Sequence, residues 1–244
     1  MNDKVIAIIL GRKGSKGVKD KNTMDILGKP AFSYSFTAAK TSKYVDKIFV
    51  TSDHEKILKT AINEGFSIIK RPKYLCNDEA LFEDALVHAY NKIKRIIKSK
   101  PKYIVVLMCN VVTVDAELID KGVELLNNNK TADSAVTVSI FNMYSPLRAR
   151  KLSEEGFLEP FVPFEVFGNP LSLNCDRDSQ GSVYFADMSH TVCRSDCIEN
   201  IDEGLLPQKW MGQKIAPIFS EAGFDLDYEW QLPALKYWIK KYGK

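Results

Sequence analysis

The sequence lacks the features of a membrane, secreted or nucleic-acid-binding protein. No run approaches the roughly 18 consecutive apolar residues of a membrane-spanning helix. The first apolar run, Val5–Leu10, is too short for the core of a signal peptide. The net charge is only +3, so the composition predicts no basic tail for nucleic acid. We therefore expect a cytoplasmic protein that binds neither membranes nor nucleic acids.

Cysteine is also scarce. The five cysteines are odd in number and scattered, and the one close pair, Cys193 and Cys197, has no second pair nearby. This spacing does not favour a zinc site, and scattered thiols suit a reducing compartment. Repeats and low-complexity tracts are absent as well. A chain of 244 residues with this composition favours a single domain, residues 1–244, that carries an insertion.

What the sequence does contain is a distinctive stretch from Val5 to Asn22. Val5–Leu10 (VIAIIL) is continuously apolar and rich in isoleucine and valine, which predicts a strand buried on both faces of a parallel sheet. The next twelve residues hold three glycines and five lysines or arginines. Glycine lets a ligand approach the backbone, and backbone N–H groups with nearby cations bind phosphate. A loop after the first strand lies at the carboxyl edge of the sheet, where open α/β sheets bind ligands.

This loop does not match the common phosphate-binding motifs. Its order of residues is neither GxxxxGK[ST] nor GxGxxG. From composition alone, a solvated basic turn is an alternative interpretation, because loops are often rich in turn-forming and charged residues.

The loop does resemble one family signature. The order R-x-G-S-K-G-x-x-x-K-N is similar to the N-terminal signature of the CMP-sialic acid synthetases (acylneuraminate cytidylyltransferases), and is carried by Arg12, Gly14, Ser15, Lys16, Gly17, Lys21 and Asn22. The resemblance implies that these residues bind the triphosphate of CTP, with Arg12 and Lys21 also catalytic. It further implies a nucleotidyltransferase that joins CTP to a 2-keto sugar acid, of the sialic or nonulosonic kind, and releases pyrophosphate.

Further apolar runs predict the remaining strands, and helical segments lie between several of them. This alternation is typical of α/β folds with a mostly parallel sheet. Together with the resemblance, it predicts a three-layer α/β/α nucleotidyltransferase fold of the Rossmann-like type. Asp53 is expected to cap the helix 55–63. The expected strands are Lys47–Thr51, Ser67–Lys70, Tyr103–Met108, Ser134–Ser139, Gln180–Phe185 and Ile215–Phe219.

Residues 144–178 interrupt this pattern. They are rich in proline, glycine and phenylalanine, and parts of them resemble the sequence around the dimerisation insert of the family. An apolar, loop-rich excursion suits a partner surface, and the resemblance implies a homodimer. A lid folded on its own domain is the alternative.

Arg71 is a candidate contact for the nucleotide base. The segment from Arg71 to Asp78 resembles the family's R-P-x-x-L-x-x-D, which implies a position near the cytosine of CTP. Without the resemblance, a solvated cation at the end of a strand is the simpler interpretation.

Asp225 and Asp227 form a D-x-D motif before the last helix. On an extended segment the two side chains share one face, and two carboxylates on one face repel each other unless a cation lies between them. Mg²⁺ commonly bridges such carboxylates to phosphate oxygens. As an alternative, Asp227 is only the N-cap of the last helix. The resemblance implies that both aspartates are catalytic and bind Mg²⁺, with Mn²⁺ as a second option.

The sequence departs from the family where the sugar acid would bind. The family usually has L-Q-P-T-S-P after the central strand, and this chain has L-M-C-N-V-V at residues 107–112. The resemblance therefore places Met108, Asn110 and Val111 beside the sugar acid. Gln180, where the family has asparagine, is a second expected substrate contact. Because methionine and valine cannot donate to a hydroxyl, we expect an acceptor other than N-acetylneuraminic acid.

Three functions stay open at this point. The first is a CTP-dependent cytidylyltransferase for a nonulosonic acid. The second is a sugar nucleotidyltransferase that uses another nucleotide or sugar. The third is a catalytically silent relative that keeps the fold. The complete basic loop and both aspartates argue against the third, whereas the altered segment after the central strand argues for it.

Overall fold

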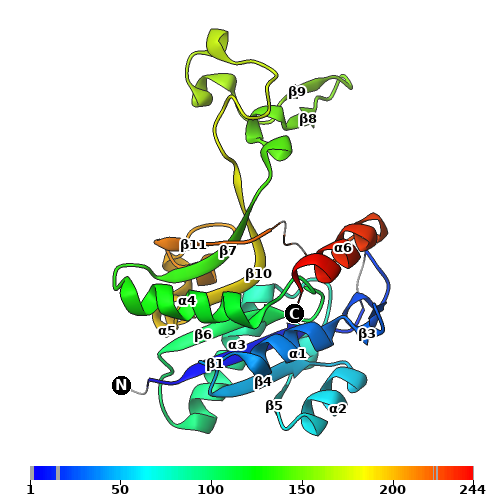
Figure 1. Cartoon of the computed structure of the whole chain (residues 1–244), viewed down its shortest axis with the longest axis vertical. Coiled ribbons are helices and arrows are strands. Elements are labelled where there is room, and N and C mark those ends of the chain that lie inside the picture. The colour runs from blue at the N-terminus through cyan, green and yellow to red at the C-terminus, as the bar shows by residue number, and fades with distance from the viewer. Residues whose placement is uncertain (1–2, 15–16, 222, 224, 244) are drawn as a thin grey trace.

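The computed structural model of the chain describes residues 3–14, 17–221, 223 and 225–243. Its centre is a seven-stranded sheet with the order β11-β7-β10-β6-β1-β4-β5 (Figure 1). These strands are β1 (Val5–Gly11), β4 (Lys47–Ser52), β5 (Ser67–Lys70), β6 (Tyr103–Met108), β7 (Ser134–Ile140), β10 (Tyr184–Arg194) and β11 (Ile215–Phe219). Two short hairpins lie outside the sheet and consist of β2 (Asp25–Ile26) with β3 (Lys29–Pro30) and β8 (Arg150–Leu152) with β9 (Leu158–Pro160).

The sheet is mostly parallel, as the sequence predicts. Neighbouring strands run parallel except at β10, which is antiparallel to both β6 and β7. β1 is buried along its whole length. The chain passes from β1 to β4 and β5 on one side and then to β6 on the other side of β1. Such a reversal leaves a crevice at the carboxyl ends of β1 and β6, and the glycine-rich loop begins there.

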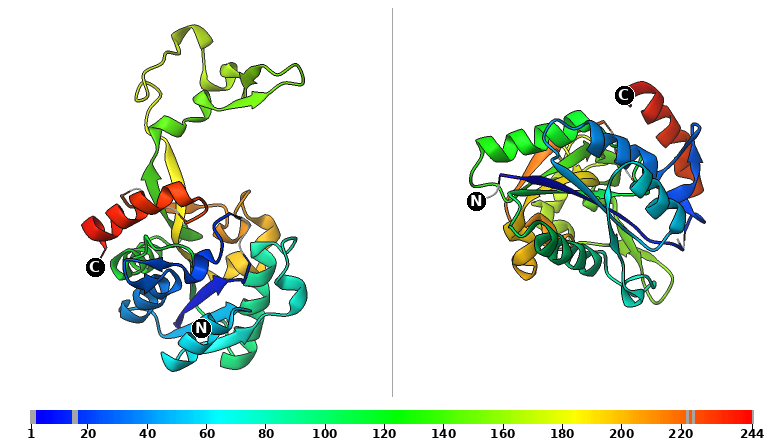
Figure 2. Two further views of the ribbon diagram at one scale, coloured as in Figure 1. Left: turned by 90° about the vertical axis from the view of Figure 1, so that its right-hand side faces the viewer. Right: turned by 90° about the horizontal axis from the view of Figure 1, so that it is seen from below.

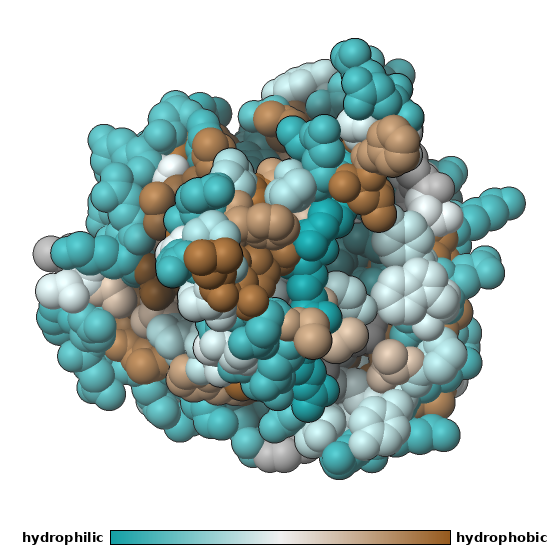
Figure 3. Space-filling view, turned by 90° about the horizontal axis from the view of Figure 1, so that it is seen from above, coloured by the Kyte–Doolittle hydropathy of each residue, from teal (hydrophilic) through white to brown (hydrophobic). Residues whose placement is uncertain are grey.

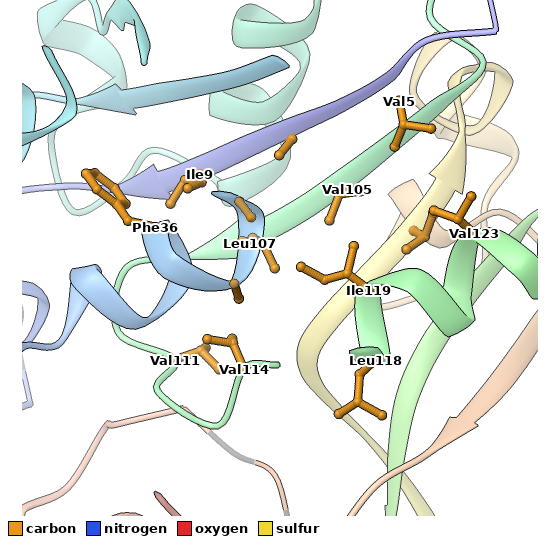
Figure 4. Packing of buried hydrophobic residues seen from close by; sticks show 14 of the residues in the cluster. Val5, Ile9, Phe36, Val105, Leu107, Val111, Val114, Leu118, Ile119 and Val123 are labelled. Carbon is orange, nitrogen blue, oxygen red and sulfur yellow. The ribbon is translucent and has the colours of Figure 1, made fainter. Parts of the chain in front are cut away.

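Helices cover both faces of the sheet and complete the three predicted layers (Figures 1 and 2). In β6, Val105 and Leu107 point into one hydrophobic core and Ile104 and Val106 into the other, because side chains alternate along a strand. Figure 4 shows α1 and α4 packed on the first of these cores. Within the described residues, no helix is long and apolar enough to cross a membrane. The helices are α1 (Phe32–Thr41), α2 (Glu55–Asn63), α3 (Phe82–Ile97), α4 (Ala116–Asn128), α5 (Ser195–Glu199) and α6 (Leu232–Tyr242).

Between β7 and β10 the chain leaves the sheet as a projecting arm, residues 141–183 (Figures 1 and 2). The arm holds the β8–β9 hairpin and several short 3-10 turns, and it stands away from the sheet instead of folding over it as a lid. Seen from above, apolar and polar side chains are mixed on the surface (Figure 3). Seven apolar side chains of the arm are between 63% and 94% exposed, namely Tyr144, Leu152, Phe157, Leu158, Phe161, Val166 and Leu171.

Candidate active site

A cavity of about 340 Å³ lies at the carboxyl ends of β1 and β6. Most of the residues singled out in the sequence line it, namely Arg12, Gly17, Lys21, Asn22, Arg71, Asn110, Asp225 and Asp227. The rest of the wall is mainly apolar and consists of Leu10, Gly11, Leu75, Ala80, Leu81, Phe82, Ala85 and Met108. The fold therefore brings the basic loop, the arginine after β5 and the two aspartates into one site.

Some of the predicted residues are not seen to line the cavity. Gly14 belongs to the loop but does not line the cavity, and Ser15 and Lys16 lie outside the described residues. Gln180 lies in a turn at the base of the arm, where its Nε2 donates to Oγ of Ser179 at 2.9 Å. The strand expected to begin at Gln180 begins at Tyr184 instead, so Gln180 stays on the arm. The structure therefore does not support its prediction as a contact in this cavity.

The loop packs directly against the aspartate motif. A Cβ atom on Gly17 would lie 2.3 Å from the carbonyl oxygen of Asp227, so only glycine permits this approach. Gly14 has a φ of 75°, which residues with a side chain rarely adopt. The glycine spacing is thus explained by one close backbone contact and one left-handed residue.

Asp53 holds the start of the loop. Its Oδ1 accepts the backbone N–H of Lys13 at 2.7 Å. The prediction that Asp53 caps α2 is wrong, because His54 is the N-cap and its Nδ1 accepts the N–H of Lys56 at 3.2 Å. A side chain expected to stabilise a helix therefore positions the loop instead.

Two of the cations that line the cavity each form an ion pair with a carboxylate. Arg12 Nη2 lies 2.7 Å from Asp78 Oδ1, and Lys21 Nζ lies 2.5 Å from Asp227 Oδ1. The Asp78 and Asp227 side chains are 47% and 48% exposed, and pairs of this kind contribute only about 0.2–1 kcal/mol. A charge-assisted hydrogen bond to phosphate contributes roughly 1.5–3 kcal/mol. Anionic phosphate oxygens can therefore replace these carboxylates at both cations.

Asn22 and Arg71 supply the buried polar groups of the cavity. Asn22 donates from Nδ2 to the carbonyl of Arg12 at 2.8 Å, which fixes its amide orientation, and Arg71 donates from Nη2 to the carbonyl of Thr51 at 3.1 Å. Arg71 is only 8% exposed, and burial lowers its pKa, so the solvated-cation interpretation is wrong. Among the described residues, neither Oδ1 of Asn22 nor Nε of Arg71 has a hydrogen-bond partner. Both atoms are themselves buried from solvent, although both residues line the cavity.

The aspartate motif forms the opposite wall. Asp225 Oδ2 accepts Nδ2 of Asn110 at 3.1 Å, and the backbone N–H of Leu226 donates to the carbonyl of Asn110. Burial, and then the charge of Asp227, raise the pKa of Asp225. Asp227 is not the N-cap of α6, because Gln231 occupies that position. The Oε1 atom of Gln231 accepts the backbone N–H of Asp227 at 2.7 Å. The side chain of Asp227 is directed to Lys21 instead.

This carboxylate pair fits a divalent cation that phosphate helps to bind. Burial first, and the charge of Asp227 second, raise the pKa of Asp225, and the ammonium group of Lys21 contacts Asp227. Carboxylate oxygens are the ligands that Mg²⁺ prefers. No group of three or more histidine, cysteine or acidic side chains in the described part of the chain could hold a metal ion. Water and phosphate oxygens would therefore have to complete the coordination.

The segment after β6 differs from its prediction. Met108 and Asn110 line the cavity, but Val111 is fully buried in the core and cannot contact a sugar acid. The backbone of Val111 pairs instead with that of Asp225 in an isolated antiparallel bridge. Burial of the Val111 side chain stabilises the backbone that forms this bridge to Asp225.

The crevice at the strand reversal, the basic glycine loop and the facing carboxylates place the protein in the class of α/β nucleotidyltransferase folds. Residues 6–154, more than half of the chain, match the profile of the family described as cytidylyltransferase. The chain belongs to the cytidylyltransferase family.

Several known proteins are similar in sequence. Pseudaminic acid cytidylyltransferase and UDP-2,4-diacetamido-2,4,6-trideoxy-beta-L-altropyranose hydrolase of Helicobacter pylori is 32% identical over 61% of this chain and 28% of its own length. N-acylneuraminate cytidylyltransferase of Escherichia coli is 37% identical over 36% of this chain and 21% of its own. Pseudaminic acid cytidylyltransferase of Campylobacter jejuni is 40% identical over 32% of this chain and 34% of its own. The matches thus span between 21% and 34% of the length of these relatives.

Solved structures share the fold over almost the whole chain. A CMP:2-keto-3-deoxy-manno-octonic acid synthetase complexed with CTP superposes with a TM-score of 0.66 at 14% identity, over 98% of this chain and 99% of that one. 4-Diphosphocytidyl-2C-methyl-D-erythritol synthase of Anaerococcus prevotii gives a TM-score of 0.63 at 10% identity, over 98% and 97% of the two chains. These similarities confirm the predicted three-layer fold.

Proposed function

We propose that the protein transfers CMP from CTP to a nonulosonic acid and releases pyrophosphate. The observation that carries this proposal is the Lys21–Asp227 contact of 2.5 Å, which joins the basic loop to the carboxylate pair within one cavity. A triphosphate bound by the loop would then lie beside those carboxylates. Family membership supplies the nucleotide, and the names of the similar proteins supply the class of acceptor.

The cavity has to neutralise the negative charge of its two proposed substrates. A triphosphate and a sugar acid together carry about five negative charges, and phosphoryl transfer is catalysed mainly by positioning and by neutralising charge. Arg12 and Lys21 would bind the β- and γ-phosphates, together with backbone N–H groups of the loop and with Ser15 and Lys16. The anomeric hydroxyl of the acceptor attacks the α-phosphorus, and pyrophosphate leaves.

Asp225 and Asp227 would hold Mg²⁺, or Mn²⁺ in its place. When bound, such an ion neutralises charge on the phosphate and lowers the pKa of the attacking hydroxyl. Asn110 keeps Asp225 oriented through its amide, and Lys21 changes partner from Asp227 to phosphate. This assignment uses both residues of the aspartate motif and leaves the loop free for the triphosphate.

The polar atoms of Asn22 and Arg71 suit a pyrimidine base. Asn22 Oδ1 is an acceptor and Arg71 Nε–H is a donor, and neither has a partner in the described part of the chain. A cytosine edge offers an amino donor beside ring acceptors. Leaving such buried groups without a partner costs roughly 1–3 kcal/mol each. We therefore expect these two side chains, which line the cavity, to turn toward a base that brings a donor to Asn22 and an acceptor to Arg71.

Pyrophosphate release, measured with the four ribonucleoside triphosphates and a panel of keto-sugar acids, tests this function. We expect release with CTP and a nonulosonic acid only. Release with another nucleotide would instead indicate a different nucleotidyltransferase. The absence of release with every pair would indicate a catalytically silent relative.

We further propose that N-acetylneuraminic acid is not the preferred acceptor. Met108 lines the cavity where the family usually has glutamine, and a thioether cannot donate to a substrate hydroxyl. A hydroxyl buried without a partner costs about 1–3 kcal/mol. In a comparison of kcat/KM at saturating CTP, an acid in which further hydroxyls are replaced by deoxy or acylamino positions, such as pseudaminic acid, should rank above N-acetylneuraminic acid. Met108→Gln should reduce the difference in kcat/KM between these two acceptors. A first rank for N-acetylneuraminic acid would contradict this prediction.

We also propose that the protein is a homodimer joined through the arm. The exposed apolar side chains of the arm make a poor surface for water but a good one for a second copy. Light scattering at micromolar protein should give about twice the chain mass of 27.6 kDa. Phe157→Asp combined with Leu171→Asp should yield monomers, whereas Ile62→Asp, an exposed position on α2, should leave the dimer intact. A wild-type mass near 27.6 kDa would exclude this assembly.

We also propose that the protein is cytoplasmic. All five cysteines are unpaired, which suits a reducing compartment. Labelling with an alkylating reagent in denatured cell extracts should modify all five without prior reduction.

A further inference from the structure

The pairing of β10 with β7 is interrupted by a bulge close to the candidate active site. Ala186 pairs with Val138 and Thr191 with Val136, so residues 187–190 lie opposite the single residue Thr137. Three of these four residues are polar and buried, namely Asp187, Ser189 and His190. Bulges redirect side chains and occur often beside active sites. This one brings a carboxylate into the interior of the protein.

The carboxylate of Asp187 accepts three hydrogen bonds from described residues. Its Oδ1 accepts Oγ1 of Thr137 at 2.5 Å and the N–H of Ser189 at 3.0 Å, and its Oδ2 accepts Oγ of Ser139 at 2.7 Å. Asp187 is only 8% exposed. Burying a carboxylate is unfavourable unless hydrogen bonds compensate it. An apolar residue would fill the same space without that penalty, which points to a role beyond packing.

The hydrogen bonds continue from Asp187 to the segment that carries the aspartate motif. Ser139 donates its proton to Asp187, so its oxygen is left to accept the N–H of Gly223 at 3.1 Å. A Cβ atom on Gly223 would lie 2.6 Å from both Asp187 Oδ2 and Ser189 Oγ, so the backbone there rests directly on the bulge. Asp225 follows two residues later.

The same bulge also holds the segment after β6. Ser189 Oγ and Thr113 Oγ1 lie 2.7 Å apart, and the N–H of Asp115 donates to Nε2 of His190 at 2.7 Å. Asn110, which donates to Asp225, belongs to this segment. The bulge therefore contacts both of the segments that meet at Asp225.

We propose that Asp187 is a positioning residue that fixes Gly223, and with it the carboxylates of Asp225 and Asp227; its link to a divalent cation rests on the proposed function. The direction of the hydrogen bonds is the essential feature. Because a carboxylate only accepts, both hydroxyls must donate to it, and Ser139 is thereby oriented to accept from Gly223. An amide at position 187 would donate to Ser139 and compete with Gly223.

Two measurements on Asp187→Asn and Ser139→Ala test this role. Hydrogen exchange should show lost protection in peptides covering residues 221–229, while peptides from β1 and β4 keep theirs. Mn²⁺ titrated in the presence of CTP should bind about 10- to 100-fold more weakly, as is typical when an outer contact of a metal ligand is removed. Cytidine binding should stay within about twofold, since the Asn22–Arg71 side of the cavity does not touch the bulge.

Ser195→Ala is the matched control, because its buried hydroxyl donates to the carbonyl of Pro101 at 2.6 Å, away from the aspartate motif. If both test variants behave like this control, the proposal is wrong. It is also wrong if exchange rises while Mn²⁺ affinity is unchanged, since the bulge would then serve stability alone. If the wild-type protein itself binds no Mn²⁺, the proposed metal site fails, and the exchange measurement still decides whether Asp187 fixes the segment.

Discussion

Asp225→Asn is expected to reduce pyrophosphate release by about 100- to 1000-fold, because a cation on phosphate contributes several kcal/mol to the transition state. Burial, and then the charge of Asp227, raise the pKa of Asp225, and a bound cation would offset the second of these effects. Asparagine keeps the shape and can still meet Asn110 after a flip of its amide. Asp227→Asn should have a similar effect and should also release Lys21 from its present partner.

The measurement is pyrophosphate release over a range of Mg²⁺ concentrations at saturating CTP and acceptor. Asp20→Asn is a suitable control, because Asp20 is exposed, does not line the cavity and has a φ of 52° that asparagine readily adopts. Its activity should match that of the wild type. Near wild-type activity of Asp225→Asn or Asp227→Asn at limiting Mg²⁺ would show that the metal assignment is wrong.

Arg12→Ala and Lys21→Ala are each expected to weaken CTP binding by roughly 10- to 150-fold, which corresponds to 1.5–3 kcal/mol for a charge-assisted contact with phosphate. Cytidine binding should change by less than about twofold, since these contacts act on phosphate alone. Lys21→Ala should also leave the repulsion between Asp225 and Asp227 without compensation, because it removes the ammonium group that contacts Asp227.

Calorimetric titration with CTP and with cytidine distinguishes a loss of phosphate contacts from a general loss of nucleoside binding. Lys19→Ala removes an exposed cation of the same loop that does not line the cavity, and it should bind CTP almost as well as the wild type. Equal losses for CTP and cytidine in Arg12→Ala would mean that this side chain supports the fold of the loop instead of binding phosphate.

Local patterns predicted much of this architecture. The apolar run of β1 and the glycines after it are adjacent in sequence, so their roles as buried strand and turning loop can be interpreted without the fold. The D-x-D motif is equally local. The resemblance to a family then connected the two, which composition alone could not do.

Contacts between distant segments could not be predicted. Asp53 looked like a helix cap because its neighbours in sequence suggested one, but its partner Lys13 lies 40 residues away. Asp187 meets Thr137 at a separation of 50 residues, through a bulge that no local pattern indicates. The family resemblance places Val111 beside the sugar acid, but its side chain is buried in the core, because the direction of the chain after β6 depends on distant contacts.

The contact between Lys21 and Asp227 also makes the two proposed ligands depend on each other. A triphosphate that draws Lys21 away leaves Asp227 open to a cation, and a cation at Asp227 releases Lys21 for phosphate. Each ligand should therefore bind more tightly when the other is present, and thermodynamic reciprocity requires the two enhancements to be equal. We therefore expect the ion pair to make the binding of metal and nucleotide cooperative, which favours the complete metal–nucleotide complex over either component alone.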